Sequence, residues 1–369
     1  MKLIIFLAAA SVGLADEYIA DSARGAKLFD TMSCAFCHSI NGQGGKIAPD
    51  LGRIVDRSFT PASLAATMWN HAPTMWEAMR QRNFKPIDMT PQNARDLFAY
   101  FYSARFFDKP GDAGRGKRAF TERGCTKCHG LTEVVKPMIK PVSQWEALDN
   151  PIALAQAMWN HRQYMIQETS ESRVKWPELT AQDLTDMLVY FRHLPKPPSK
   201  TPVFMIGADQ NGVAVFNAKG CPVCHTPGSG LAGRIRGETL TAIAAEMWNH
   251  APRMAAAGAK PVEFAPGEMQ ELLNYLWARQ FFQDYGNPAA GKRVFESKRC
   301  AVCHGDPASG APRIEGQAMT ASEIVSALWH HGVQMLDQMR AKNIPWPRFE
   351  GQQMSDLLAF LNSGAKGKP

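Results

Sequence analysis

The stretch Cys34-Ala35-Phe36-Cys37-His38 recurs three more times with the same spacing of cysteine and histidine. The other copies are Cys125-Thr126-Lys127-Cys128-His129, Cys221-Pro222-Val223-Cys224-His225 and Cys300-Ala301-Val302-Cys303-His304. The four copies use all 8 cysteines of the 369-residue chain, so no thiol remains for a disulfide. This recurrence predicts four short tandem units, where length alone suggests two or three domains.

Cys-x-x-Cys-His is the signature of covalent haem c attachment. Two thiols one helical turn apart can each bond a vinyl group of one porphyrin, and the following histidine then supplies an imidazole to the iron. A redox dithiol does not need the histidine, and a zinc site needs two cysteine pairs brought together. The sequence therefore predicts four covalently attached haem c groups. We expect attachment at Cys34, Cys37, Cys125, Cys128, Cys221, Cys224, Cys300 and Cys303, with His38, His129, His225 and His304 as proximal iron ligands.

A second recurring segment contains the candidates for the sixth iron ligand. It reads Met68-Trp69-Asn70-His71 in the first copy, and its tryptophan, histidine and following methionine recur in all four. Both residue types can bind haem iron and both recur in all four copies; we favour the methionines, and histidine or an open or mixed arrangement is the alternative. The preferred set is Met75, Met165, Met254 and Met335, and the alternative set is His71, His161, His250 and His331. Pro73 and Pro252 predict a break or kink in two of these segments.

The tryptophans of this segment, Trp69, Trp159, Trp248 and Trp329, have two interpretations. An indole combines a large apolar ring with one hydrogen-bond donor. The rings could therefore pack on a haem edge and donate to a propionate. Alternatively, they are core residues with a surface hydrogen bond.

The remaining pattern predicts an all-α fold. Gly and Phe recur nine and five residues before each first cysteine, and each copy ends in a helix-like segment, at 95–102, 183–191, 269–277 and 353–361. Thr60-Pro61, Asn150-Pro151 and Thr90-Pro91 read as helix starts, and Thr320 with Glu323 as a capping box. We expect a signal peptide at 1–15 and domains 1 to 4 at 16–109, 110–199, 200–285 and 286–369.

The connections between the copies are of two kinds. The linkers after the first and third copies match, with Phe106-Phe107 in one and Phe281-Phe282 in the other, whereas the linker at 194–202 is rich in proline. A proline-rich segment is a stiff, extended spacer. The simplest interpretation is two duplicated di-haem units joined at this spacer.

The order of these segments resembles class I cytochrome c domains, repeated four times over nearly the whole chain after residue 15. The resemblance implies small helical domains whose first and last helices cross, one low-spin haem in each, and electron transfer as the activity. In many class I domains the sixth ligand is a methionine just before the final helix. Only the first copy has a methionine there, Met89, which is a departure from the family pattern.

The N-terminus and the charge bear on location and partners. Lys2 followed by an apolar stretch ending near Ala15 is typical of a secretory signal. We therefore expect a periplasmic or otherwise exported protein with no transmembrane anchor after cleavage. The net charge of +7 is a mild excess that does not indicate nucleic-acid binding.

The leading functional hypothesis is electron transfer between redox partner proteins or a membrane electron-transfer complex, without catalysis of its own. The alternatives are a haem enzyme, such as a peroxidase or a reductase of small oxyanions, and a cytochrome subunit of a dehydrogenase. A filament of stacked haem domains is a further alternative, because fold does not fix function.

Overall fold

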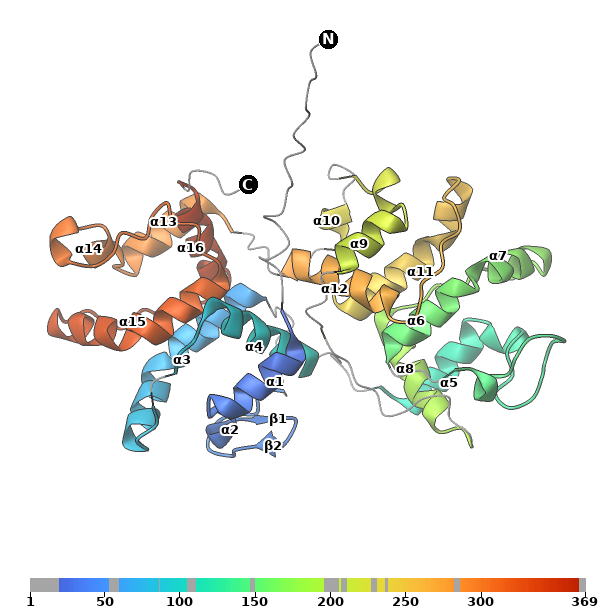
Figure 1. Cartoon of the computed structure of the whole chain (residues 1–369), viewed down its shortest axis with the longest axis horizontal. Coiled ribbons are helices and arrows are strands. Elements are labelled where there is room, and N and C mark those ends of the chain that lie inside the picture. The colour runs from blue at the N-terminus through green and yellow to red at the C-terminus, as the bar shows by residue number, and fades with distance from the viewer. Residues whose placement is uncertain are drawn as a thin grey trace, which may run out of the picture.

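The computed structural model describes residues 20–52, 60–85, 87–104, 111–146, 150–195, 206, 211–226, 231–235, 238–281 and 286–364 (Figure 1). The expected signal peptide and most of the proline-rich spacer lie outside these residues. The regular secondary structure of the described residues is helical apart from one short antiparallel hairpin. The all-α prediction is therefore confirmed. None of the described helices is long and apolar enough to cross a membrane.

The elements follow the four copies in chain order. Domain 1 contains α1 (Ser22–Thr31), α2 (Cys34–Cys37), β1 (Ser39–Ile40), β2 (Gln43–Gly44), α3 (Pro61–Gln81) and α4 (Pro91–Ala104). Domain 2 contains α5 (Ala113–Glu122), η2 (Cys125–Lys127), η3 (Val142–Gln144), α6 (Pro151–Asn160), α7 (Arg162–Glu171) and α8 (Ala181–Arg192). Domain 3 contains α9 (Asn211–Ala218), η4 (Cys221–Val223), α10 (Leu231–Arg234), α11 (Leu240–Ala256) and α12 (Glu268–Phe281). Domain 4 contains α13 (Pro288–Ser297), α14 (Ala301–His304), η5 (Pro307–Ser309), α15 (Ala321–Ala341) and α16 (Gln353–Asn362).

The predicted helix starts are confirmed by local hydrogen bonds. Thr60 accepts from Ser63 N before α3, and Asn150 accepts from Ile152 N before α6. Thr320 and Glu323 form the expected capping box of α15. These side chains satisfy backbone N–H groups that have no partner within the first turn of a helix.

In every copy, the first helix packs against the last: α1 on α4, α5 on α8, α9 on α12 and α13 on α16. The recurring glycine makes this close approach feasible. A Cβ atom at Gly116 would lie 2.1 Å from the backbone oxygen of Asp186 and 2.8 Å from Cβ of Tyr190. Gly25, Gly212 and Gly291 meet the last helices of their own domains in the same way. The glycine that recurs nine residues before the cysteines therefore marks the helix crossing.

A buried aspartate stabilises the contact between the first and last helices of domain 2. Asp186 on α8 accepts hydrogen bonds from Arg115 Nε (2.7 Å) and from the backbone N of Asp112 (2.8 Å), which caps α5. Asp96 makes the equivalent contacts with Arg24 and Asp21 in domain 1. Burial opposes the charge on Asp186, but the hydrogen bonds from Arg115, Gln182 and Asp112 N outweigh it and lower its pKa.

This pKa shift predicts a pH-dependent contribution to stability. Because the folded-state pKa lies below the unfolded value of about 3.9, the carboxylate stabilises the fold above that pH and loses this effect as pH falls through the folded-state pKa. We expect Asp186→Asn to be less stable than wild type at pH 7, with the difference shrinking below about pH 4. Thermal unfolding between pH 7 and pH 3 measures this, with exposed Glu122→Gln on α5 as control. A constant difference across that range would contradict the assignment.

The four domains associate in space as two pairs. Helix α3 of domain 1 packs on α15 and α16 of domain 4, and α11 of domain 3 packs on α6 and α8 of domain 2 (Figure 1). The expectation that successive domains form the two di-haem units is therefore wrong for their spatial arrangement, which pairs domain 1 with 4 and domain 2 with 3. The reason is a set of contacts between distant segments, described below.

A smaller joint connects the two pairs. The Tyr102 hydroxyl at the end of α4 accepts a hydrogen bond from Leu240 N (3.1 Å), and its ring lies 4.5 Å from that of Trp277 on α12. Ser22 exchanges hydrogen bonds with the backbone of Ile206. These contacts join domain 1 to domain 3, both at its last two helices and in the segment before α9.

Candidate functional site

The four cysteine motifs share one local geometry. The residue before each first cysteine has a positive φ: Ser33 (63°), Gly124 (80°), Gly220 (73°) and Arg299 (65°). The backbone N of each motif histidine then donates to the carbonyl of the first cysteine, at 2.9 Å in all four copies. This closes one helical turn and brings the two cysteines and the histidine together. The motif therefore has the compact form that attachment to one porphyrin requires.

The first thiol of each motif is not activated for redox chemistry. All 8 cysteines are unbridged. Burial raises the pKa of Cys34, Cys125 and Cys300 to about 11 and also raises that of Cys221. A reactive dithiol has instead a lowered pKa, because the thiolate is the nucleophile. Within the described residues, no three His, Cys, Asp or Glu side chains are grouped to hold a metal ion.

In three domains, the motif histidine faces the histidine of the Trp-Asn-His segment. The ring centroids lie 6.2 Å apart for His38 and His71 and 6.1 Å apart for His129 and His161. The third pair, His225 and His250, is separated by 6.4 Å. Metal–imidazole bonds are about 2 Å long, and each ring centroid lies about 1 Å behind its nitrogen, so two imidazoles on opposite sides of one metal have centroids about 6 Å apart. The three pairs fit one iron between each two rings.

Hydrogen bonds at Nδ1 orient several of these rings. His38 donates from Nδ1 to Pro49 O (3.0 Å), and His304 to Pro312 O (2.8 Å). His161 donates from Nδ1 to Ala157 O (2.8 Å). A carbonyl only accepts, so the proton lies on Nδ1 and Nε2 is left with a lone pair, the arrangement of a metal-binding histidine. His161 Nε2 is buried and has no hydrogen-bond partner, which fits an iron ligand.

The electrostatics favour neutral rings. Burial, and then the neighbouring His38, lowers the pKa of His71. Burial and His161 lower the pKa of His129 in the same way. For His250, burial and then Arg253 lower the pKa. Only a neutral imidazole binds a metal, so the pocket favours the ligand form before iron is bound.

The preferred methionines lie one helical turn beyond these histidines. Met75, Met165, Met254 and Met335 are half-buried, and Met165 and Met254 pack against the hydrophobic core. An iron with a histidine on each side has no free position, so a methionine can bind only where the second histidine does not. The ring separations favour histidine in domains 1 to 3, and the preference for methionine drawn from the sequence stays a prediction.

The predicted break at the two prolines is wrong. Helices α3 and α11 continue through Pro73 and Pro252. A proline leaves the carbonyl four residues earlier without its helical partner. At Pro73 this carbonyl belongs to Trp69, and it accepts a hydrogen bond from Trp346 Nε1 of domain 4 (3.0 Å). The break occurs in domain 2, where α6 ends and α7 begins at His161.

Domain 4 differs from the other three. His331 is exposed, and its ring lies 6.2 Å from that of the adjacent His330. His330 replaces the asparagine of the other copies, and its Nε2 lies 3.0 Å from Asp88 Oδ1 of domain 1. The ligand of this fourth site therefore stays a prediction from position alone.

The tryptophans bind other domains. Trp69 Nε1 donates to Pro347 O (3.0 Å). Asn70 beside it exchanges two hydrogen bonds with the backbone of Phe349, each 2.8 Å long. We call this pair of residues a Trp–Asn clasp. It holds α3 of domain 1 to the loop before α16 of domain 4.

Two further clasps join domains 2 and 3 reciprocally. Trp159 donates to Val262 O (3.0 Å) and Trp248 donates to Pro177 O (2.7 Å). The adjacent Asn160 and Asn249 bond Phe264 and Leu179. An indole has one N–H, and in Trp69, Trp159 and Trp248 it donates to a backbone carbonyl, which favours the second interpretation of these tryptophans, that of core residues with a hydrogen bond. The clasp asparagines were missed as functional residues, although Asn follows the tryptophan in three copies.

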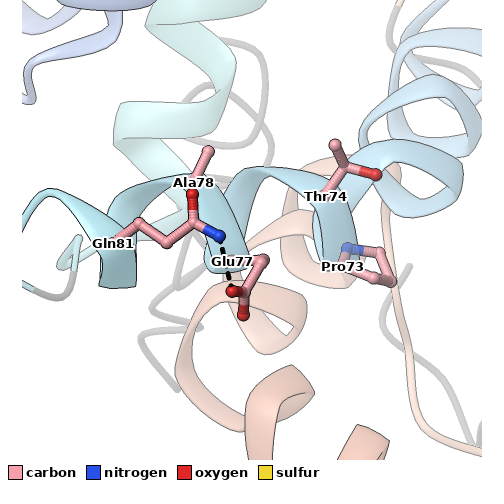
Figure 2. Close-up of a pocket in the computed structure, with 5 residues that line it drawn as sticks. All are labelled: Pro73, Thr74, Glu77, Ala78 and Gln81. Carbon is pink, nitrogen blue, oxygen red and sulfur yellow. Dashed lines mark hydrogen bonds between the residues drawn. The ribbon is translucent and has the colours of Figure 1, made fainter.

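One groove on the surface does not belong to these sites. Figure 2 shows it along α3, lined by Pro73, Thr74, Glu77, Ala78 and Gln81, with Gln81 Nε2 donating to Glu77 (2.8 Å). No cysteine, histidine or methionine lines it, and Glu77 also binds Arg80. The groove is open and has no iron ligand in its lining, so it does not match a haem pocket.

The comparison with known proteins agrees with the motif chemistry. The family model for cytochrome c matches residues 22–104 and 288–365. These stretches cover nearly all of the described parts of domains 1 and 4. Neither a curated protein nor a solved structure matches the chain. Domains 2 and 3 lie outside the matched stretches, yet they have the same helix crossing and the same Cys-x-x-Cys-His turn.

Proposed function

We propose that the whole chain is an exported tetrahaem c-type cytochrome that transfers electrons between redox partners, since its residues 22–104 and 288–365 match the cytochrome c family. The observation that supports this most strongly is the fourfold Cys-x-x-Cys-His turn, with the same backbone bond in each copy. When bound, haem supplies a one-electron couple at iron, and the protein sets its potential and surroundings.

The residues of the chain divide the task of holding each haem. The two cysteines of a motif hold the porphyrin covalently, and His38, His129, His225 and His304 take the proximal position. We assign the sixth position to His71, His161 and His250, because their ring separations from the proximal histidines match one iron. His331 takes that position in domain 4 by its place on α15. Two imidazoles give a lower potential than histidine with methionine, so we expect a low-potential carrier.

A closed coordination sphere favours electron transfer over catalysis. A peroxidase or reductase needs an open iron position for its substrate, and the histidine pairs of domains 1 to 3 fill it. The apolar N-terminal segment supports export. None of the described helices is long and apolar enough to cross a membrane. The donor and the acceptor are therefore expected to be proteins that meet this cytochrome outside the cytoplasm.

The test is a haem count combined with a reductive titration of the full chain. We expect four haems per chain and the reversible uptake of four electrons, since each iron takes one. Cys125→Ala/Cys128→Ala should lower both numbers to three and serves as an internal control. Two haems, limited to the stretches that match the cytochrome c family, would contradict the proposal. Rapid turnover of peroxide would move the assignment to an enzyme.

A further inference from the structure

The clasp tryptophan and the proposed distal histidine lie on opposite sides of their helix. Trp69 is two residues before His71 on α3, and the same spacing holds for Trp248 on α11 and Trp329 on α15, whereas in domain 2 α6 ends at Asn160, before His161. At 3.6 residues per turn, two residues are separated by about 200° around the helix axis. The histidine therefore faces its own haem site while the tryptophan faces the partner domain. Each helix of this kind connects a haem site to an interface.

Aromatic rings continue this connection between domains 1 and 4. Trp69 stacks on Trp346 with centroids 5.1 Å apart, and Trp346 lies 5.6 Å from Trp76. Trp76 in turn lies 6.4 Å from Trp329, which precedes His331 by two residues. The rings are tightly packed, because a Cβ atom at Gly332 would lie 2.3 Å from the Trp76 ring. Stacked and edge-to-face contacts thus connect α3, which carries His71, to α15, which carries His331.

Domains 2 and 3 have an equivalent aromatic interface. Trp176 stacks on Trp248 with centroids 4.4 Å apart, and Trp159 lies 6.1 Å from Phe264. The Arg162 guanidinium lies 4.0 Å above the Trp159 ring. Trp248 and Trp159 each precede a distal histidine by two residues. Both pairs therefore have aromatic side chains at the interface between the segments that carry their proposed distal histidines.

The joint between the two pairs lacks this placement. Its hydrogen bond reaches Leu240 at the start of α11, ten residues before His250. At 1.5 Å per helical residue, this contact is about 15 Å along the helix from that histidine. The aromatic residues of the joint, Tyr102 and Trp277, belong to the last helices and not to the histidine-bearing ones.

We propose that electrons exchange fastest within the spatial pairs, between domains 1 and 4 and between domains 2 and 3, through the clasp aromatic residues. The order of exchange then follows space and not the chain. In each step one iron goes from ferrous to ferric while the other goes from ferric to ferrous, so no proton or co-reactant is needed. The inference rests on the proposed tetrahaem electron-transfer function.

The test uses one domain as an electron sink. In a His71→Met background, methionine raises the potential of domain 1 relative to two imidazoles, and its sulfur-to-iron absorption band bleaches when an electron arrives. A flash-generated donor delivers one electron per molecule, and the bleach is followed in time. We expect a fast phase from domain 4 and a slow phase from domains 2 and 3. Trp346→Leu should slow the fast phase severalfold.

Two further variants separate conduction from docking. Trp176→Leu changes the corresponding loop position in the other pair and should leave the fast phase unchanged. Trp346→Phe keeps an aromatic ring but loses the hydrogen bond to Trp69 O, and should retain most of the rate. Equal slowing by both Leu variants, or an unchanged fast phase in Trp346→Leu, would overturn the inference. A chain without haem would show no absorbance change at all. That result would contradict the proposed electron-transfer function, whereas the inference about the order of exchange would be contradicted by the two results above.

Discussion

Replacing His161 with alanine is expected to convert one of the four haems from low spin to high spin. His161 Nε2 is buried without a hydrogen-bond partner, and its ring lies 6.1 Å from that of the proximal His129. Removing this imidazole leaves the iron of domain 2 with one protein ligand on one side. Electron paramagnetic resonance of the oxidised variant should show a high-spin signal of about one haem in four, and that haem should bind cyanide.

Met165→Leu is the matched control for this substitution. Met165 lies one turn further along the same segment and packs against the core. Leucine has a similar volume and cannot bind iron, and swaps of this kind in a core usually cost less than about 1.5 kcal/mol. We therefore expect a low-spin spectrum like that of wild type. A high-spin haem in Met165→Leu, with a low-spin spectrum in His161→Ala, would show that methionine is the ligand.

The second large effect is expected at the helix crossing. In Gly116→Ala the new Cβ atom would lie 2.1 Å from the backbone oxygen of Asp186, which cannot move without shifting α8. Overpacking of a core costs about 1–3 kcal/mol and occasionally more, and a clash with backbone belongs at the upper end. We expect domain 2 to lose at least about 3 kcal/mol of stability, together with a loss of haem incorporation there. Thermal unfolding followed by haem absorbance measures this.

Gly114→Ala on the same helix is the control. A Cβ atom there would find only Asp112 Oδ1 within 4 Å, at 3.2 Å. Alanine is favoured over glycine inside a helix by about 1 kcal/mol, so this variant should be as stable as wild type or slightly more stable. If both variants were equally stable, the glycine would not be required by the crossing.

Local features of this fold were predictable from the sequence. The helix starts at Thr60, Asn150 and Thr320 depend on hydrogen bonds within one turn, so the residues themselves specify them. The same holds for the cysteine turn, which closes over five residues. The crossing helices were implied by the family resemblance, and the recurring glycine agrees with it.

The pairing of domains was not predictable in this way. The bond from Trp69 to Pro347 O joins residues 278 positions apart, whereas the matching linkers describe only neighbours in the chain. The opposite orientation of tryptophan and histidine was nonetheless implied by their spacing of two on a helix. The proposed choice of histidine over methionine could not be made from the sequence, because residues four apart share a helix face. It rests on the separations between the histidine rings.

The most direct test of the central claim is low-temperature electron paramagnetic resonance of the oxidised wild-type protein, with the haem content measured on the same sample. We predict four haems per chain, with domains 1 to 3 giving the low-spin signals of an iron held by two imidazoles. We also predict that these three haems give no sulfur-to-iron charge-transfer band in the near infrared. A charge-transfer band of the strength expected for four methionine-bound haems would contradict this prediction.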